Sequence, residues 1–144
     1  MKYITLLMCL VAMSTNATEV VGGKTVLRAP TTVVGVSIQQ LSNNSFHTEE
    51  SVIVIGSSTF KNVDVPSKYG VSGRVYKDFQ HLSVGFGVIY FNHVDRLNGS
   101  TFNFWDTIRY RFTNHYSVEY VHISNAGITS PNTGRDMVLV GYKF

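Results

Sequence analysis

Three side chains near the end of the chain have the types that a serine esterase requires. His122 and Ser124 are separated by one residue, and Asp136 follows twelve residues after the serine. A serine hydroxyl is a poor nucleophile until a base removes its proton, and the base histidine needs a carboxylate to fix its tautomer. The sequence therefore supplies a nucleophile, a base and an acid, which the fold must bring together.

The elements that carry these residues are predicted to be two neighbouring strands joined by a loop at residues 126–135. Side chains alternate along a strand, so His122 and Ser124 share one face, with Cα atoms about 6.6 Å apart. In the last strand, the face of Asp136 continues through apolar residues to Phe144. An apolar alternate face that ends in a C-terminal aromatic residue is typical of outer-membrane barrel strands. The three polar residues are therefore expected on the lipid-facing side.

Donors for the oxyanion of an ester-hydrolysis intermediate lie in the same segment. The candidates are the side chains of Asn125 and Asn132 and the backbone at Gly134. A His-x-Ser pair is nevertheless common in strands. The alternative interpretation is a polar pair at a strand end, in the interfacial zone of a membrane, without a catalytic role. The spacing alone leaves both interpretations open.

The first 17 residues have the parts of a secretory signal peptide. Lys2 precedes a short apolar run, and small residues lead to an expected cleavage after Ala17, so residues 1–17 are removed. The apolar run is too short to cross a bilayer as a helix. Cleavage also removes Cys9, the only cysteine, which excludes an internal disulfide and a thiolate metal site. The mature domain is expected over residues 18–144.

Length and composition limit the class of protein. A chain of 144 residues suffices for one domain and is too short for two. Its 12 Lys and Arg residues exceed the 9 Asp and Glu residues by three and are dispersed, so no nucleic-acid partner is expected. A mean hydropathy near zero excludes a bundle of membrane helices but fits a barrel with alternating faces. The other histidines lack metal-ligand spacing, so no metal and no cofactor are expected.

Turn residues recur at short intervals and no long helical period appears, which predicts an all-β fold. Eight strands are expected, at residues 19–28, 31–40, 51–58, 68–77, 81–92, 101–112, 116–125 and 136–144. With the signal peptide and Phe144, they predict an eight-stranded antiparallel transmembrane β-barrel in the bacterial outer membrane. One difficulty is residues 41–50, which fall at the periplasmic end, where turns are usually short. Either the strands extend into this segment or the first strand is wrong.

The alternation also predicts which residues face each other across the turn at residues 113–115. Facing residues in antiparallel strands point to the same side, and a three-residue turn gives partner numbers that sum to 228. Arg109 then faces Glu119 in the lumen as an ion pair. On the outside, Asp106 faces His122 and is the only charge on the apolar face of its strand.

The segment from His122 to Asp136 resembles the signature of the outer-membrane lipid A 3-O-deacylases. The matching residues are His-x-Ser-Asn-Ala, followed by Pro-Asn-x-Gly and an acidic residue. Members of that family are eight-stranded barrel enzymes that hydrolyse the ester at position 3 of lipid A. The resemblance implies that Ser124 is the nucleophile, His122 the base and Asp136 the acid. It also favours Asn132 over Asn125 as the oxyanion donor.

The chain departs from the family pattern at Asp136, where the family has glutamate. The aspartate side chain is one methylene shorter and is therefore expected to orient His122 less well. Asp106, placed opposite His122 by the predicted register, is a rival acid, although Asp136 is preferred. Gly134 matches a family position that determines the shape of the loop.

The resemblance implies lipid A, or lipopolysaccharide, as the substrate. The sequence leaves open whether the chain forms a homodimer. The alternative function is a non-enzymatic small barrel with a structural or adhesin-like role. A second alternative is a soluble periplasmic barrel that carries a lipophilic ligand in its lumen. Four basic residues in or near the expected extracellular loops are candidates for contact with lipid A phosphates, or are solvated loop charges: Lys61, Lys68, Arg96 and Arg135.

Overall fold

The structure is a computed structural model that describes residues 18–43 and 45–144, except for the side chains of residues 41–43. The expected signal peptide, residues 1–17, lies outside the described residues. Within them, no helix is long and apolar enough to cross a membrane. The strands are β1 (Thr18–Val26), β2 (Thr32–Asn43), β3 (Phe46–Ile55), β4 (Ser58–Phe60), β5 (Val63–Val65), β6 (Lys68–Phe79), β7 (Leu82–Phe91), β8 (Phe102–Arg111), β9 (Tyr116–Ser124) and β10 (Arg135–Lys143).

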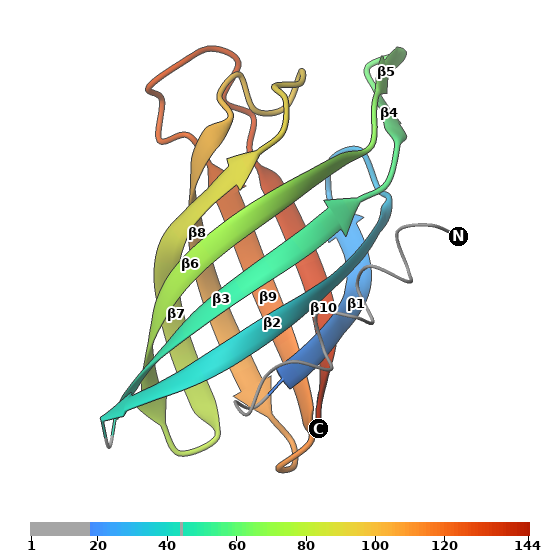
Figure 1. The fold of residues 1–144 in the computed structure, drawn as a ribbon. Coiled ribbons are helices and arrows are strands. Elements are labelled where there is room, and N and C mark those ends of the chain that lie inside the picture. Colours follow the sequence, from blue (N-terminus) through green and yellow to red (C-terminus); the bar gives the residue numbers. More distant parts are fainter. Residues whose placement is uncertain (1–17, 44) are drawn as a thin grey trace.

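Eight of these strands close into an antiparallel barrel in the order β1-β10-β9-β8-β7-β6-β3-β2 (Figure 1). The short strands β4 and β5 form a separate hairpin between β3 and β6. Figure 1 shows this hairpin and the long β7–β8 and β9–β10 connections at one end, here named the loop end. The short turns and the C-terminus lie at the opposite end, here named the turn end. Closure of the sheet leaves the barrel without an unpaired strand edge.

The fold confirms the prediction of an eight-stranded antiparallel barrel and removes its one difficulty. The first strand is part of the barrel, because β1 pairs with both β10 and β2. Strands β2 and β3 extend into the troublesome segment, so that β3 begins at Phe46 rather than at residue 51. The turn between them is therefore short, as expected at that end. The hairpin of β4 and β5 was not predicted from the sequence.

The outer wall of the barrel is apolar, as the alternation predicts. In β10, Val138, Val140 and Tyr142 are exposed, whereas Met137 and Leu139 between them are buried. The same alternation places the large apolar residues of β7 and β8 outside. No other layer of the protein covers these apolar side chains, so the outer wall matches a lipid environment.

Charged side chains form an ion-pair network in the lumen. Near the turn end, Arg109 pairs with Glu49 at 2.7 Å and with Glu119 at 2.9 Å, and all three residues are buried. Arg74 also pairs with both carboxylates. The pairing of Arg109 with Glu119, derived above from the register, is thus confirmed. This charged interior does not fit the alternative of a barrel that carries a lipophilic ligand.

An apolar cluster occupies the part of the lumen nearer the loop end. Its members are Val21, Val33, Ile53, Ile55, Ile89, Phe91, Trp105, Val121, Ile123, Met137 and Leu139. Ile123 and Met137 belong to the strands that carry His122 and Asp136, so the candidate site sits directly outside this cluster. The packing fixes both strands from within and leaves their outward side chains free for other contacts.

Candidate active site

The imidazole of His122 is bound to the carboxylate of Asp136 on the outer wall. The two residues face each other in the β9–β10 ladder, and His122 Nδ1 lies 2.9 Å from Asp136 Oδ1. The hydroxyl of Tyr120 donates to the same oxygen at 2.7 Å. Asp136 is 6% exposed and His122 is partly exposed. An imidazole held through Nδ1 by a carboxylate presents Nε2 as a base, which is the orientation that a catalytic triad requires.

Ser124 is the last residue of β9 and lies on the same outward face as His122. It is partly exposed and faces Phe104 in the β8–β9 ladder. Its hydroxyl has no hydrogen-bond partner among residues 18–43 and 45–144. His122 and Ser124 are thus on one face and two residues apart, but they are not joined by a hydrogen bond in this structure.

Asp106, the rival acid, lies on the other side of His122. The β8–β9 register places it opposite His122, as derived from the sequence. Its side chain is exposed and makes no hydrogen bond or ion pair within the described part of the chain. Of the two carboxylates that flank His122, the one on β10 therefore carries the hydrogen bond.

Asn125 holds the β9–β10 loop together from inside. Its Nδ2 donates to the carbonyl and hydroxyl of Thr129 at 2.9 and 2.8 Å, and its Oδ1 accepts the amide of Gly127 at 3.0 Å. The residue is fully buried. These contacts use the carboxamide within the loop, so the geometry gives Asn125 a structural role and does not favour it as an oxyanion donor.

Asn132 has the opposite arrangement. Its Oδ1 accepts the backbone amide of Asn125, the residue that follows Ser124, at 3.0 Å, and this bond holds the oxygen side of the carboxamide. A backbone bridge to Asn98 holds the residue in place. Asn132 is exposed, and its Nδ2 has no partner in the described ranges. A carboxamide fixed through its oxygen leaves its NH₂ group as a ready donor.

Gly134 packs its backbone against the imidazole of His122. A Cβ atom at this position would lie 3.0 Å from His122 Cε1. The residue has φ +73°, a conformation that side chains rarely adopt. Its amide donates to the carbonyl of Leu97 at 3.2 Å, so this donor is already engaged. Gly134 thus shapes the site, whereas the sequence-based suggestion that its amide binds the oxyanion is not favoured by this hydrogen bond.

A buried ion cluster anchors this loop to the rest of the loop end. Asp95 Oδ2 lies 2.7 Å from Lys68 Nζ and 2.6 Å from Arg135 Nη2, and the three side chains are at most 1% exposed. Burial alone would raise the pKa of the Asp95 carboxyl, but Lys68 and Arg135 hold it well below its usual range. Lys68 and Arg135 are consequently structural cations. They are not available for the contacts with lipid phosphates that their sequence positions suggested.

Three contributors to the site were not identified from the sequence. Tyr120 lies on the same strand face as His122, and no sequence pattern predicts that its hydroxyl reaches Asp136. Arg28 donates from the β1–β2 loop to the carbonyl of Thr133. Leu97 accepts the amides of both Thr133 and Gly134. The last two contacts join loops that are far apart in sequence, and only the closed barrel makes them neighbours.

Among the described residues, no group of three or more histidine, cysteine, aspartate or glutamate side chains is arranged to hold a metal ion. The chemistry available at the site is that of His122, Ser124, Asp136, Tyr120 and Asn132.

Comparisons with known proteins agree with this geometry. The sequence profile of the family described as lipid A 3-O-deacylase (PagL) matches residues 64–144, which include every residue of the candidate triad. No curated protein matches the chain in sequence. The crystal structure of the outer membrane enzyme PagL is similar in fold, with a TM-score of 0.59 and 21% identity over 89% of this chain and 98% of that one.

A second solved structure, that of the Yersinia pestis outer membrane protein Ail, has a TM-score of 0.53 and 10% identity over 90% of this chain and 99% of that one. At these identities both structures show the shared fold alone. The family profile covers more than half of the chain and is the more specific finding. The chain therefore belongs to the lipid A 3-O-deacylase (PagL) family.

Proposed function

We propose that this protein is an outer-membrane serine esterase that releases the 3-O-linked acyl chain of lipid A with Ser124 as nucleophile, His122 as base and Asp136 as orienting acid. Family membership supports the hydrolase activity and the substrate. The observation that carries the assignment of residues is the hydrogen bond between His122 and Asp136 on the outer wall, with Ser124 on the same face. The proposal needs one copy of the chain, since all of its residues come from a single barrel.

In the first step, the Ser124 hydroxyl attacks the carbonyl carbon of the 3-O-acyl ester while His122 Nε2 takes its proton. The Ser124–His122 hydrogen bond that this step needs forms when substrate is bound, because catalytic hydrogen bonds often tighten only in the complex. Asp136 holds the ring at Nδ1, and the Tyr120 hydroxyl donates to the same oxygen of Asp136. The negative charge that develops on the carbonyl oxygen is stabilised by the NH₂ group of Asn132.

In the second step, the intermediate collapses and the ester C–O bond breaks. His122 returns the proton to the departing 3-hydroxyl group of the sugar, and the acyl group remains on Ser124. In the third step, His122 takes a proton from a water molecule that attacks the acyl carbonyl carbon. The bond to Ser124 Oγ then breaks, His122 returns the proton to Ser124, and the fatty acid leaves. None of these steps requires a metal or a redox group.

The position of the triad on the outside of the barrel suits a lipid substrate. The acyl chains of lipid A already lie beside the apolar outer wall, so the bilayer delivers the ester and no deep pocket is needed. Phe102, Phe104 and Ile108 of the neighbouring strand β8 provide apolar surface next to β9. Apolar contacts between the acyl chains and this wall replace the apolar contacts that the chains make with neighbouring lipids.

Mass spectrometry of lipid A from cells that express the protein tests the proposal. We expect the loss of one 3-hydroxyacyl chain in cells with the natural sequence and no loss in cells with Ser124→Ala. The amount of variant in the outer membrane, checked by heat-modifiable gel mobility, serves as the control for folding. Unchanged lipid A with a folded natural protein would favour the non-enzymatic barrel instead.

A further inference from the structure

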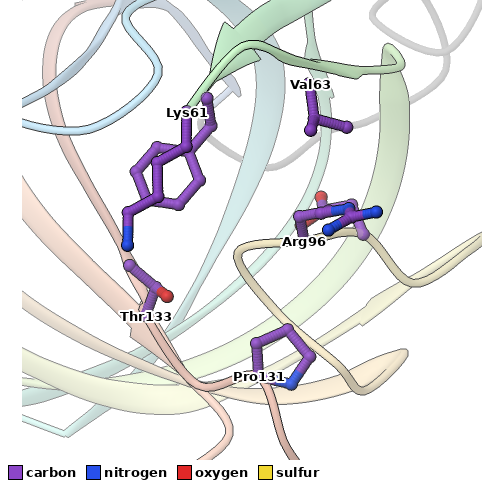
Figure 2. A pocket seen from close by; sticks show the side chains of 7 residues that line it. Lys61, Val63, Arg96, Pro131 and Thr133 are labelled. Atoms are coloured by element: carbon purple, nitrogen blue, oxygen red, sulfur yellow. The ribbon is translucent and has the colours of Figure 1, made fainter.

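A pocket of about 570 Å³ opens at the loop end, where three connections that are distant in sequence meet. It is lined by Phe60, Lys61 and Val63 of the β4–β5 hairpin, by Asp95 and Arg96 of the β7–β8 connection, and by Pro131 and Thr133 of the β9–β10 loop. Figure 2 shows the Lys61 side chain extending toward Thr133, with Arg96 across the pocket from it. The volume lies within the range of pockets that hold small ligands.

The free charges of this pocket are cationic. Lys61 and Arg96 are exposed, and neither forms an ion pair within the described part of the chain. The carboxylate of Asp95 also borders the pocket, but it is already paired with two buried cations, Lys68 and Arg135. Its negative charge is therefore compensated, and the pocket retains two unpaired positive charges.

The surroundings add to this positive charge. Arg28 lies beside the pocket, since it donates to the carbonyl of Thr133. Arg135 is 1% exposed, and its Nε and Nη1 atoms have no hydrogen-bond partner within the described ranges. The acid of the hairpin, Asp64, follows Val63 in β5, and alternation along the strand directs it away from the side that Val63 presents to the pocket.

The floor of the pocket is the same loop that carries the candidate oxyanion donor. Pro131 and Thr133 flank Asn132, whose carboxamide is fixed by the amide next to Ser124. Thr133 is followed by Gly134, which packs on the ring of His122. A ligand seated on Pro131 and Thr133 is thus held against the segment that shapes the triad.

We propose that this pocket binds the phosphorylated glucosamine headgroup of lipid A and so places the 3-O-acyl ester of the same sugar at Ser124. The inference rests on the function proposed above and deepens it by naming how the substrate is positioned. A phosphate group offers several acceptor oxygens and a negative charge, which the guanidinium of Arg96 and the ammonium of Lys61 match. The hydroxyl of Thr133 is a partner for the hydroxyl groups of the sugar.

Binding by the inactive Ser124→Ala protein in detergent micelles tests the pocket without interference from hydrolysis. The ligands are bisphosphorylated lipid A and the same lipid A with its phosphates removed. We expect the phosphorylated lipid to bind about tenfold more tightly, as charge-assisted hydrogen bonds predict. We expect Lys61→Gln with Arg96→Gln, in the same background, to abolish that preference.

A matched control removes two lysines at the turn end, with Lys77→Gln and Lys143→Gln. It lowers the net charge of the protein by the same amount and should keep the preference for the phosphorylated lipid. If all three proteins bind both lipids equally, or if the preference survives the loss of Lys61 and Arg96, the pocket is not the headgroup site. If the control loses the preference as fully as the pocket variant does, the effect is one of net charge and the inference is likewise overturned.

Inorganic phosphate separates a headgroup site from a site for free anions. We expect about a hundredfold molar excess of phosphate over lipid A to leave the lipid bound, because phosphate alone lacks the sugar and the apolar wall contacts. Displacement that depends on Lys61 and Arg96 would overturn the assignment to a lipid headgroup.

Hydrolysis by the protein with Ser124 intact distinguishes the two proposals. We expect a KM for phosphorylated lipid A that rises about tenfold in the Lys61 and Arg96 variant, with kcat little changed, as for loss of uniform binding. Hydrolysis with the same KM for both lipids rejects the pocket and leaves the esterase intact. A preserved binding preference without any hydrolysis rejects the esterase and leaves the pocket.

Discussion

At the scale of single residues, the candidate site depends on which carboxylate orients His122. The carboxyl group of Asp136, on β10, accepts hydrogen bonds from both His122 and Tyr120. Asp106, on β8 at the other side of His122, is exposed. The family pattern has glutamate at position 136, and the sequence left open whether the shorter aspartate would reach. A distance of 2.9 Å shows that it does, because the two residues face each other in one ladder.

Replacement of each carboxylate by its amide tests this assignment. We expect Asp136→Asn to lower kcat by about 10³- to 10⁴-fold, because the amide favours the wrong imidazole tautomer. Asp106 faces His122 in the β8–β9 ladder as Asp136 does in the β9–β10 ladder, so Asp106→Asn is the matched control. We expect it to change kcat by no more than a few-fold. The measurement is release of the 3-hydroxy fatty acid from lipid A in micelles. A large loss in the Asp106 variant alone would assign the orienting role to Asp106.

The two asparagines of the site should also behave differently. Asn132→Ala removes a free donor together with the acceptor of the Asn125 amide, so we expect kcat to fall by about 10²- to 10³-fold and the free energy of unfolding to fall by about 1 kcal/mol. Asn125→Ala removes the bonds that close the loop, which costs about 1–3 kcal/mol of stability for a buried polar network. Parallel measurements of kcat and of the unfolding midpoint separate these effects. Normal kcat in a folded Asn132→Ala protein would exclude Asn132 as the oxyanion donor.

At the scale of elements, the three residues of the candidate triad lie on one hairpin, β9 and β10, whose outward faces were predictable. Period-2 alternation fixed the faces of His122, Ser124 and Asp136, and the turn length fixed the partner of His122 on β8. The shape of the intervening loop was not predictable. It depends on Leu97 and Arg28, which lie in other connections and share no sequence pattern with it.

Gly134 provides a test of how the loop positions the base. Gly134→Ala places a methyl group 3.0 Å from His122 Cε1, and we expect kcat to fall by about 10²-fold because the ring is displaced. Gly127→Ala is a matched control, since Gly127 has φ +79° but nothing within 4 Å of an added Cβ. Both variants bear a similar backbone strain of about 1–2 kcal/mol. Equal losses of activity in the two would show that strain, rather than contact with His122, matters.

The predicted start of the third strand, at residue 51, is wrong. Residues 47–50 are all polar, which is typical of a connection, so the pattern predicts a periplasmic connection rather than the start of β3. His47 and Glu49 in fact point into the polar lumen, where His47 binds Asp78 at 2.7 Å and stacks on Tyr76. Polar residues that face a charged lumen cannot be told from loop residues by hydropathy alone.

At the scale of the whole molecule, the barrel combines an apolar outer wall with a lumen that is charged near the turn end. Three features of the sequence were enough to predict the architecture: a signal-like N-terminal segment, the alternation of polar and apolar residues along the strands, and Phe144. The ion network was predictable only in part, through the pair of Arg109 and Glu119. Its third member, Glu49, comes from a strand on the far side of the closed sheet, which no local pattern reveals.

The network should stabilise the barrel as a unit. Arg109→Met leaves Glu49 and Glu119 with less compensation, and breaking a buried ion pair from one side costs about 3–5 kcal/mol. Arg111→Met, at a partly exposed ion pair with Asp78 near the turn end, is the control and should cost about 1 kcal/mol or less. Urea unfolding in vesicles, with gel mobility reporting the folded fraction, measures the free energy of unfolding of both variants. Equal stability of the two variants would contradict a structural role for the lumen network.

Covalent labelling of the nucleophile tests the central claim, a functioning triad on the outer wall, most directly. A serine-reactive fluorophosphonate, applied to the protein in micelles and followed by peptide mass spectrometry, should modify Ser124. The labelling should fall sharply in His122→Asn and Asp136→Asn proteins that still fold as barrels. Failure to label Ser124 in a natural protein that hydrolyses lipid A, or hydrolysis that persists in Ser124→Ala, would contradict the account.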